Sequence, residues 1–243
     1  MSKERIDKLL VELGYFSTRG KAQEAIKQGR VFLSLKQISK TSELFDKNEK
    51  FEIRGEDFVG RGALKLKKAL EEFQIDCRNL TMMDVGASTG GFSEILIQSL
   101  ARKVYAVDVG ENQLDQKLKN HEKIINLEKT HILELNELPE LMDGFVMDVS
   151  FISVLKIFSH LKKLAKPDAW VVSLIKPQFE VGREALPKDG VVKDQKEWER
   201  VKKLITDFIK EHHWTLKGWI ESPVLGKTGN KEFFCYFKFQ NNI

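Results

Sequence analysis

Hydrophobic positions in the first 60 residues predict two short helices followed by a small sheet. Apolar residues recur at helical spacing over residues 4–13, which predicts an amphipathic helix. Ser17 or Thr18 is positioned to cap a second helix, and Gly29 is expected to end it in a left-handed conformation. Two short strands are expected to follow, over residues 31–33 and 50–54. The pattern therefore predicts a compact α+β module with a thin core.

From residue 61 onward the pattern changes to alternating strands and helices. Strands are expected over residues 82–85, 104–109, 124–127, 145–147 and 171–175, and helices over residues 92–101, 112–120, 151–165 and 194–212. This alternation is typical of a parallel sheet with helices on both faces, so we expect an α/β, Rossmann-like fold. Two final strands, 214–221 and 232–239, are joined by a short loop and form a hairpin, so the last strand is expected to be antiparallel.

Composition excludes several classes of protein. The chain has 243 residues, of which 42% are hydrophobic and 31% charged, which rules out a disordered or fibrous protein. No run reaches the ~18 apolar residues of a membrane-spanning helix, and the acidic residues near the N-terminus argue against a secretory signal. Cys77 and Cys235 fit neither a disulfide framework nor a metal knuckle. We therefore expect a cytoplasmic protein without a metal. The net charge is +4, with the basic excess within the first 68 residues; charge alone favours a solvated helix face over a nucleic-acid surface.

A glycine-rich segment, residues 84–92, follows the first strand of the larger sheet and begins a helix. Ser88 breaks the Gly-x-Gly-x-x-Gly pattern of dinucleotide sites, and no Gly-Lys-Ser/Thr of a phosphate loop is present. Asp84 precedes the turn and Asp108 ends the next strand, where a carboxylate can accept both hydroxyls of a ribose. This arrangement favours S-adenosylmethionine, which has no phosphate and whose ammonium group would suit Asp84. The alternative is a purely structural turn.

Five segments resemble those of the TlyA family. The members of this family are FtsJ-like ribosomal-RNA ribose 2′-O-methyltransferases, historically labelled haemolysins. These segments are residues 84–92, 108–114, 148–153, 176–182 and 222–233. Residues 1–55 are similar to the S-four RNA-binding module, through Arg5-Ile6-Asp7, residues 18–22 and Gly29-Arg30-Val31. Phe32-Leu33-Ser34 replaces the usual Val-Asn-Gly, and Gly60 stands where a serine is usual.

The resemblance implies S-adenosylmethionine-dependent 2′-O-methylation of a ribose, that of a cytidine, in ribosomal RNA within ribosomal subunits. The short N-terminus favours large-subunit RNA. The implied organisation is an RNA-binding domain over residues 1–58, a linker over 59–64 and a methyltransferase domain over 65–243. Two alternatives are a membrane-active haemolysin-like protein and a catalytically silent ribosome-binding factor. No metal and no membrane partner are expected.

The resemblance also implies a catalytic tetrad of Lys65, Asp148, Lys176 and Glu232. Transfer to a ribose hydroxyl requires the hydroxyl to be oriented and its proton accepted. A lysine can do this if burial and a neighbouring cation lower its pKa. Lys176 and Asp148 each follow an apolar strand, at the edge where α/β sheets build their sites. The structural alternatives are a strand-end lysine that reaches solvent, a helix-capping role for Asp148 and an edge charge at Glu232.

The remaining candidate residues fall into two groups. The implied cofactor-binding residues are Asp84, Gly86, Ala87, Ser88, Thr89, Gly90, Gly91, Phe92, Asp108 and Asp148. The implied RNA-binding residues are Arg5, Arg19, Lys21, Arg30, Arg61, Lys67 and Lys68. His212 and His213 lack partners at ligand spacing, so no metal site is expected there. The long loop over residues 179–192 lies next to the expected site and can close over RNA.

Overall fold

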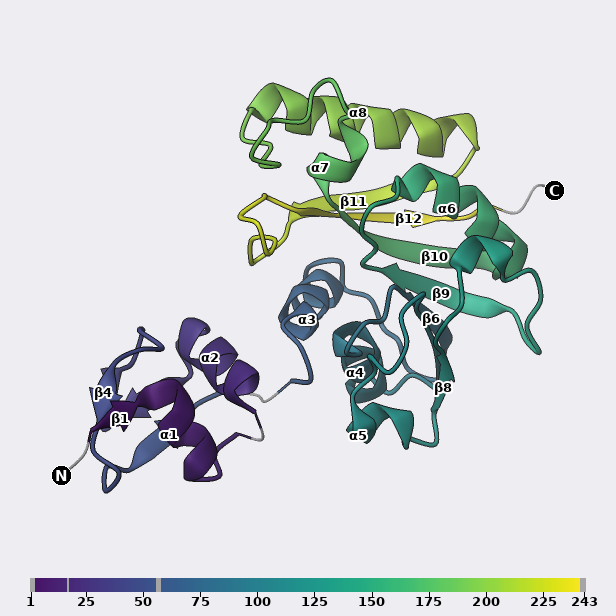
Figure 1. Ribbon diagram of the computed structural model, residues 1–243. Coiled ribbons are helices and arrows are strands. Elements are labelled where there is room, and N and C mark those ends of the chain that lie inside the picture. Colours follow the sequence, from purple (N-terminus) through teal and green to yellow (C-terminus); the bar gives the residue numbers. More distant parts are fainter. Residues whose placement is uncertain (1–2, 17, 56–57, 241–243) are drawn as a thin grey trace. The chain divides into compact units, whose positions relative to one another are not determined.

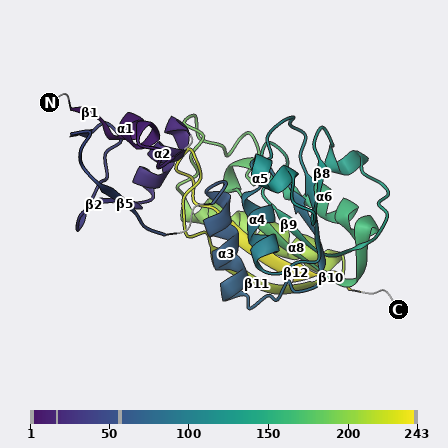
Figure 2. The same cartoon turned by 90° about the horizontal axis from the view of Figure 1, so that it is seen from below.

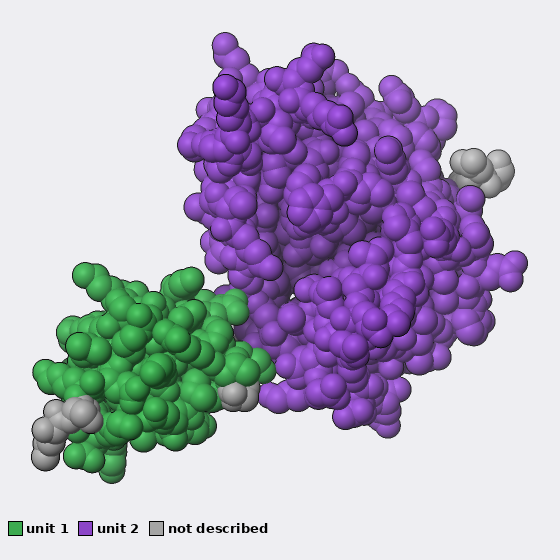
Figure 3. All heavy atoms as spheres, viewed as in Figure 1, with its two compact units in different colours: residues 1–57 green, residues 58–243 purple. Residues whose placement is uncertain are grey.

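The computed structural model describes residues 3–16, 18–55 and 58–240, and it divides into two compact units, residues 1–57 and 58–243 (Figure 3). The segment expected to be a linker, 59–64, belongs to the second unit by its contacts. Val59 and Ala63 are buried there, and the first helix of the unit begins at Gly62. In the sequence, Val59 is an apolar residue between acidic residues and Arg61, and this apolar position is the sign that the segment packs within the second unit.

The first unit consists of two helices and two small antiparallel sheets. Its elements are β1 (Glu4–Arg5), α1 (Ile6–Glu12), α2 (Arg19–Lys27), β2 (Val31–Leu33), β3 (Lys36–Gln37), β4 (Leu44–Phe45) and β5 (Phe51–Ile53). Strand β1 pairs with β4, and the second sheet has the order β3-β2-β5. The apolar faces of both helices are buried against these strands, in one small core.

The turns of this unit explain where its elements start and stop. The Thr18 hydroxyl accepts a hydrogen bond from the Lys21 backbone N–H and caps α2, whereas Ser17 lies outside the described residues. Gly29 has a φ of +71°, the left-handed conformation that ends the helix. Ser34 takes a φ of +57° between β2 and β3, so the hairpin forms although serine replaces glycine or asparagine in its turn.

The second unit is built on a seven-stranded sheet with the strand order β11-β12-β10-β9-β6-β7-β8 (Figures 1 and 2). Its strands are β6 (Thr81–Val85), β7 (Lys103–Val107), β8 (Ile124–Leu127), β9 (Met142–Met147), β10 (Ala165–Ile175), β11 (Thr215–Glu221) and β12 (Phe233–Lys238). Strands β10, β9, β6, β7 and β8 are parallel, and β12 is antiparallel to both of its neighbours. The α/β class and the antiparallel last strand are therefore confirmed.

Helices cover both faces of this sheet. They are α3 (Gly62–Glu72), α4 (Gly91–Gln98), α5 (Gln116–Lys119), α6 (Val154–Leu161), α7 (Pro177–Glu180) and α8 (Gln195–Glu211), with short 3₁₀ turns η1 (Ile132–Glu134) and η2 (Lys162–Leu164). One hydrophobic core lies under α6 and α8, and the other lies under α3 and α4. Because side chains alternate along a strand, Phe233 packs in the first core and Phe234 in the second.

Two expected helices are shorter in the structure because polar residues interrupt them. The helix expected over 112–120 is reduced to α5, whose start is capped by Asp115. The helix expected over 151–165 begins only at Val154, after the Ser153 cap, since Phe151 has a φ of +66°. In the part of the chain that the structure describes, no helix is long and apolar enough to cross a membrane.

Candidate active site

The candidate residues of the second unit gather at one edge of the sheet. Asp84 lies near the end of β6, and Asp108, Asp148 and Lys176 directly follow β7, β9 and β10. These are neighbouring parallel strands, so their carboxyl ends meet at the same edge. This is the edge at which open α/β sheets bind ligands.

The glycine-rich turn is held so closely that side chains would not fit. A Cβ atom at Gly86, where φ is +84°, would lie 2.7 Å from the backbone oxygen of Asp148. At Gly91 it would lie 2.9 Å from the backbone nitrogen of Ala63. Gly90, with a φ of +95°, is the N-cap of α4. The turn therefore brings bare backbone to the strand ends and points the α4 N-terminus at the same place.

Asp84 is completely buried and only half of its carboxyl group is satisfied. Its Oδ2 accepts hydrogen bonds from the Ser93 backbone N–H at 2.8 Å and from the Ser93 hydroxyl at 2.7 Å. Among the described residues its Oδ1 has no hydrogen-bond partner. Burial is the main cause that raises the pKa of Asp84 to about 7; the nearby Asp148 and Asp108 carboxylates contribute to this rise, and the Ser93 hydrogen bonds oppose it. A cation placed at Oδ1 would relieve both the missing partner and the cost of ionisation.

Asp108 organises the loop around the turn. Its Oδ2 accepts a hydrogen bond from the Ser88 backbone N–H, and its Oδ1 accepts one from the Gly110 N–H, both at 2.7 Å. An ionised carboxylate has about four acceptor sites, so further acceptor capacity remains on both oxygens. Asp108 thus ties the glycine-rich turn to the end of β7 and keeps acceptor sites that a ribose hydroxyl could use.

Glu128 holds the loop before α5 in place, as Asp108 does for the glycine-rich turn. The sequence pattern did not indicate this role of Glu128. Its carboxylate accepts hydrogen bonds from the Gln113 and Leu114 backbone N–H groups, at 2.7 and 3.0 Å, and pairs with Lys119. The bond from Leu114 is the largest cause that lowers the pKa of Glu128, to about 2. Glu128 thus holds the loop in place. His131 caps the η1 turn through its Nδ1 and the Leu133 N–H.

The four residues of the implied tetrad form two ion pairs. The Lys176 Nζ lies 2.5 Å from Asp148 Oδ1 and also donates a hydrogen bond of 2.9 Å to the Ser150 hydroxyl. The Lys65 Nζ lies 2.5 Å from Glu232 Oε2, and each of these side chains is only 4% exposed.

Strand register brings the two pairs to the same edge. Ile175 is opposite Phe233 at the end of the β10–β12 ladder, so Lys176 and Glu232 occupy the next position on each strand. Two structural alternatives are wrong. Glu232 is not an edge charge, because β12 is an interior strand. Asp148 does not cap α6, because Ser153 does.

Two further side chains shape the loop that follows Asp148. Glu180 is buried and accepts hydrogen bonds from the Ser153 hydroxyl, at 2.7 Å, and from the Val154 N–H, at 3.0 Å; burial raises the pKa of Glu180. Phe151 lies in the same loop, is 91% exposed, and has its ring 5.1 Å from that of Phe179. An exposed aromatic residue in a left-handed conformation is unfavourable unless it has a use. Both residues lie in the segments that carry the family resemblance, but residue type alone did not single them out.

The loop over residues 179–192 is fastened at its end by Asn230. This buried side chain accepts a hydrogen bond of 2.9 Å from the Val192 N–H and donates one of 2.9 Å to the Gly190 carbonyl. The Trp198 indole also donates to the Val192 carbonyl. The loop end is therefore clamped between α8 and the segment that leads to Glu232.

The candidate RNA-binding residues are divided between the two units. In the first, Arg5 and Arg19 both donate to the buried carboxylate of Asp7, at 3.1 and 2.9 Å. Burial alone would raise the pKa of Asp7, but hydrogen bonds from Arg5, Gln23 and Arg19 outweigh it and hold this pKa well below its usual range. Both arginine side chains are nearly half exposed, so they are held by Asp7 and remain accessible to solvent.

The other members of that group have varied surroundings. Arg30 donates to the Arg54 carbonyl at 3.2 Å. In the second unit Arg61 is the N-cap of α3, and Lys67 lies 5.9 Å from the centroid of the Phe58 ring. Lys68 is exposed and pairs with a glutamate one turn further along α3. Lys21 follows the cap of α2.

No group of three or more metal-ligating side chains occurs among residues 3–16, 18–55 and 58–240. His212 is used structurally, since its Nδ1 lies 2.9 Å from the Phe208 carbonyl and its ring packs on those of Phe208 and Trp214.

Comparison with known proteins gives a consistent result. A family model described as FtsJ-like methyltransferase matches residues 58–239, and one described as S4 domain matches residues 4–46. The chain is 39% identical over 239 residues to YqxC of Bacillus subtilis (strain 168), which is named as a candidate rRNA methyltransferase; the match covers 96% of this chain and 85% of that one. It is 35% identical over 247 residues to the 16S/23S rRNA (cytidine-2'-O)-methyltransferase TlyA of Mycobacterium tuberculosis, covering 99% and 91%. A solved structure from Streptococcus thermophilus, named as a candidate hemolysin, is 35% identical with a TM-score of 0.75, covering 100% of this chain and 92% of that one.

Proposed function

The chain belongs to the FtsJ-like methyltransferase family, as a relative of TlyA, and we propose that it methylates the 2′-hydroxyl of a cytidine ribose in ribosomal RNA. The proposed methyl donor is S-adenosylmethionine. The proposed substrate is RNA within ribosomal subunits in the cytoplasm, with large-subunit RNA favoured.

The residues around the glycine-rich turn fit this donor. Asp84 offers a buried carboxylate oxygen that has no hydrogen-bond partner within the described part of the chain, and this oxygen suits an ammonium group. Asp108 keeps acceptor capacity for ribose hydroxyls. The absence of side chains at Gly86 and Gly90 lets the turn pack directly against Asp148 and Leu118. The donor, when bound, supplies an electrophilic methyl group on a sulfonium. No phosphate group has to be neutralised, which agrees with the carboxylates at this edge.

The ion pair of Lys176 and Asp148 is the observation that carries the proposal. A ribose hydroxyl is a weak nucleophile, so it must be oriented and its proton accepted during attack. Lys176 can orient the hydroxyl from the end of β10, because Asp148 and Ser150 fix the position of its amine. It can accept the hydroxyl proton only as the free amine, so its own proton must first pass to solvent. Asp148 would also keep negative charge near the methyl group that is transferred.

The second ion pair has a supporting role in this proposal. Lys65 and Glu232 are buried together, and Glu232 lies beside Lys176 in the strand register. Their pairing fixes the start of β12 against α3. This keeps the wall of the site in place behind the reacting hydroxyl.

The first unit is proposed to bind RNA, and the second to carry the chemistry, with the division between residues 57 and 58. Support for RNA binding comes from the match of residues 4–46 to the S4 domain and from the two arginines that Asp7 holds at the surface. In the second unit, the exposed ring of Phe151 offers a face on which an unstacked base can pack beside Lys176.

Methyl transfer from labelled S-adenosylmethionine tests the proposal. The protein is incubated with ribosomal particles from cells that lack it, the 30S, 50S and 70S particles are separated, and the labelled nucleotide is mapped. We expect label on a cytidine ribose of the large-subunit RNA that is lost with Lys176→Ala. The surface variant Lys203→Ala, on α8, is the matched control. Absence of label from all particles, or leakage of lipid vesicles caused by the protein without cofactor, would refute the proposal.

A further inference from the structure

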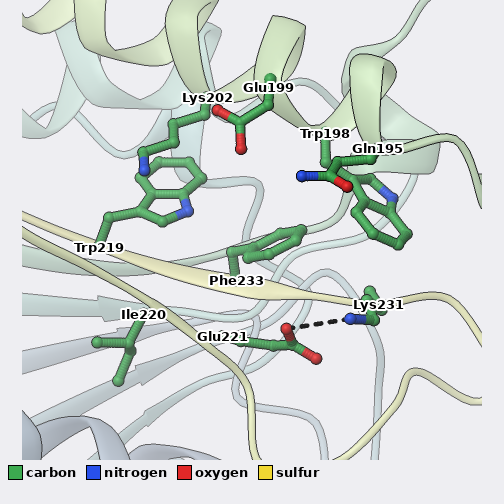
Figure 4. Close-up of a pocket in the computed structure, with 9 residues that line it drawn as sticks. All are labelled: Gln195, Trp198, Glu199, Lys202, Trp219, Ile220, Glu221, Lys231 and Phe233. Atoms are coloured by element: carbon green, nitrogen blue, oxygen red, sulfur yellow. Dashed lines mark hydrogen bonds and ion pairs between the residues drawn. The ribbon is translucent and has the colours of Figure 1, made fainter.

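An open pocket of about 300 Å³ lies between α8 and the β11–β12 hairpin, and nothing in the proposed chemistry uses it. Three aromatic side chains form its apolar part: Trp198 from α8, Trp219 from β11 and Phe233 from β12. Figure 4 shows the Phe233 ring between the two indoles, and its centroid is 6.1 Å from each. Two lysines reach over the indoles, with the Lys202 Nζ 5.9 Å from the Trp219 ring and the Lys231 Nζ 4.9 Å from the Trp198 ring.

The polar groups of the pocket are both acidic and basic. Lys231 pairs with Glu221 at 3.2 Å, and the carboxylate of Glu199 and the amide of Gln195 complete the rim. The pocket is therefore not simply an anion-binding site. It combines flat ring faces, cations at two points and acceptors that can receive N–H groups.

We propose that this pocket is a second RNA subsite, which receives one unstacked base that carries an exocyclic amino group. The inference rests on the proposed function, which makes RNA the substrate. Aromatic faces between cations are the means by which proteins hold single-stranded nucleotides: the base stacks and the lysines contact its phosphates. Glu199 and Glu221 select adenine, cytosine or guanine, because a carboxylate accepts from an amino group and repels the carbonyl edge of uracil.

The position of the pocket agrees with this ligand. Glu221 pairs with Phe233 in the strand register, at the same edge of the sheet as Lys176 and Glu232. Glu232 and Phe233 are consecutive, so their side chains leave the strand on opposite faces. An RNA strand that presents a ribose at Lys176 can therefore place a neighbouring part of its chain around the hairpin end and into the pocket. A basic peptide is less suitable, because its cations would be repelled by Lys202 and Lys231.

The test compares binding of fluorescent 12-residue oligo(A), oligo(C) and oligo(U) RNA to the full chain. Trp219→Leu removes a stacking face and keeps an apolar side chain, and Lys202→Ala changes an exposed residue on α8. Trp198 is left unchanged because its indole also holds the Val192 carbonyl. Lys203→Ala is the matched control: it lies next to Lys202 on α8 but does not line the pocket, and it pairs with Asp207.

We expect Trp219→Leu to weaken oligo(A) and oligo(C) binding by about 5- to 150-fold, as loss of one stacked base would. Lys202→Ala should weaken it several-fold, Lys203→Ala should have no effect, and oligo(U) should bind less tightly than oligo(A) to the wild type. Affinity for S-adenosylhomocysteine reports that each variant is folded. With ribosomal particles as substrate, Trp219→Leu should raise KM.

Wild-type oligonucleotide affinity in folded Trp219→Leu would overturn the inference, as would equal losses with Lys202→Ala and Lys203→Ala. A pocket that instead binds a ribosomal protein would also overturn it, and would show as a raised KM for particles with unchanged binding of all three oligonucleotides. The proposed function is judged separately. If the wild type methylates particles, that function stands whatever the pocket binds; if the wild type transfers no methyl group, it fails.

Discussion

The buried carboxylate of Asp84, whose Oδ1 has no hydrogen-bond partner among the described residues, should make both stability and cofactor binding depend on pH. Its pKa is raised from the ordinary 3.8 to about 7 in the folded protein, mainly by burial. A group with a raised folded-state pKa stabilises the fold fully below its unfolded pKa, and this stabilisation is lost as the pH rises through the folded-state value. The difference between the two pKa values corresponds to about 4 kcal/mol of the free energy of unfolding in total. Between pH 4 and 7 the loss is up to about 1.4 kcal/mol for each pH unit.

Asp84→Asn isolates this effect because it keeps the size of the side chain and the acceptor for Ser93 but cannot ionise. Without cofactor, we expect the wild type to lose stability relative to Asp84→Asn as the pH is raised from 5 to 8. Urea denaturation of both proteins at each pH is the measurement, and the difference between them removes the contribution of all other titrating groups. The exposed Asp76→Asn should show no such pH dependence in this range, since the Arg78 hydrogen bond lowers the pKa of Asp76.

Cofactor binding should show the opposite dependence. An ammonium group at Oδ1 favours the ionised carboxylate, so affinity for S-adenosylhomocysteine should rise with pH, by up to about tenfold for each unit below pH 7. Calorimetry from pH 5.5 to 7.5 measures this, and Asp84→Asn should bind weakly and without the pH dependence. The reasoning is refuted if the stability difference between the two proteins is the same at pH 5 and pH 8. It is equally refuted if the wild-type affinity does not change with pH.

Four further outcomes follow from the site. Lys176→Ala should lower the single-turnover methylation rate by roughly 10²- to 10⁴-fold with little change in cofactor affinity, and Lys176→Arg should not restore it because a guanidinium cannot act as a base. Asp108→Ala should weaken binding of S-adenosylhomocysteine about tenfold or more in calorimetry, since hydrogen bonds to a charged group contribute roughly 1.5–3 kcal/mol. Glu232→Gln should destabilise the protein by about 3–5 kcal/mol in urea denaturation, because it leaves the buried ammonium of Lys65 unpaired; a loss below 1 kcal/mol would mean that the pair is not buried in solution. Removal of residues 1–57 should leave cofactor affinity intact and abolish methylation of ribosomal particles; full activity would contradict an RNA-binding role for this unit.

Local pattern predicted most of the second unit because its strands and helices are separated by clear changes of period. The helix expected over 194–212 is α8, and the strand expected over 124–127 is β8 with the same bounds. The errors lie around the site, where the helix expected over 112–120 shrinks to one turn. There the backbone is held by long-range hydrogen bonds such as those to Glu128, which periodicity along the chain cannot show.

The candidate site was predicted only in part, because some of its residues are placed by strand ends and others by long-range contacts. The positions of Asp148 and Lys176 follow from strand ends, because a topology fixes which ends are neighbours. The burial of Glu232 depends instead on β12 inserting between β10 and β11, which makes it an interior strand. The roles of Glu180 and Asn230 depend on loop contacts over 26 and 38 residues of sequence separation, so no local signal could reveal them.

The two ion pairs differ in burial, and this difference indicates how the start of β12 is used. Lys176 and Asp148 remain partly exposed, as groups that contact a substrate must be, whereas Lys65 and Glu232 are almost completely buried. A buried pair stabilises a fold no better than apolar side chains of the same volume, so its presence here calls for a reason other than stability. The position of the pair on β12 suggests such a reason. Glu232 anchors the strand to α3 on one face of the sheet, while the next residue, Phe233, lines the aromatic pocket on the other face. A base held in that pocket would contact Phe233, next to the residue that the buried pair fixes beside Lys176. RNA binding on one face of the sheet would therefore help to position the reacting groups on the other.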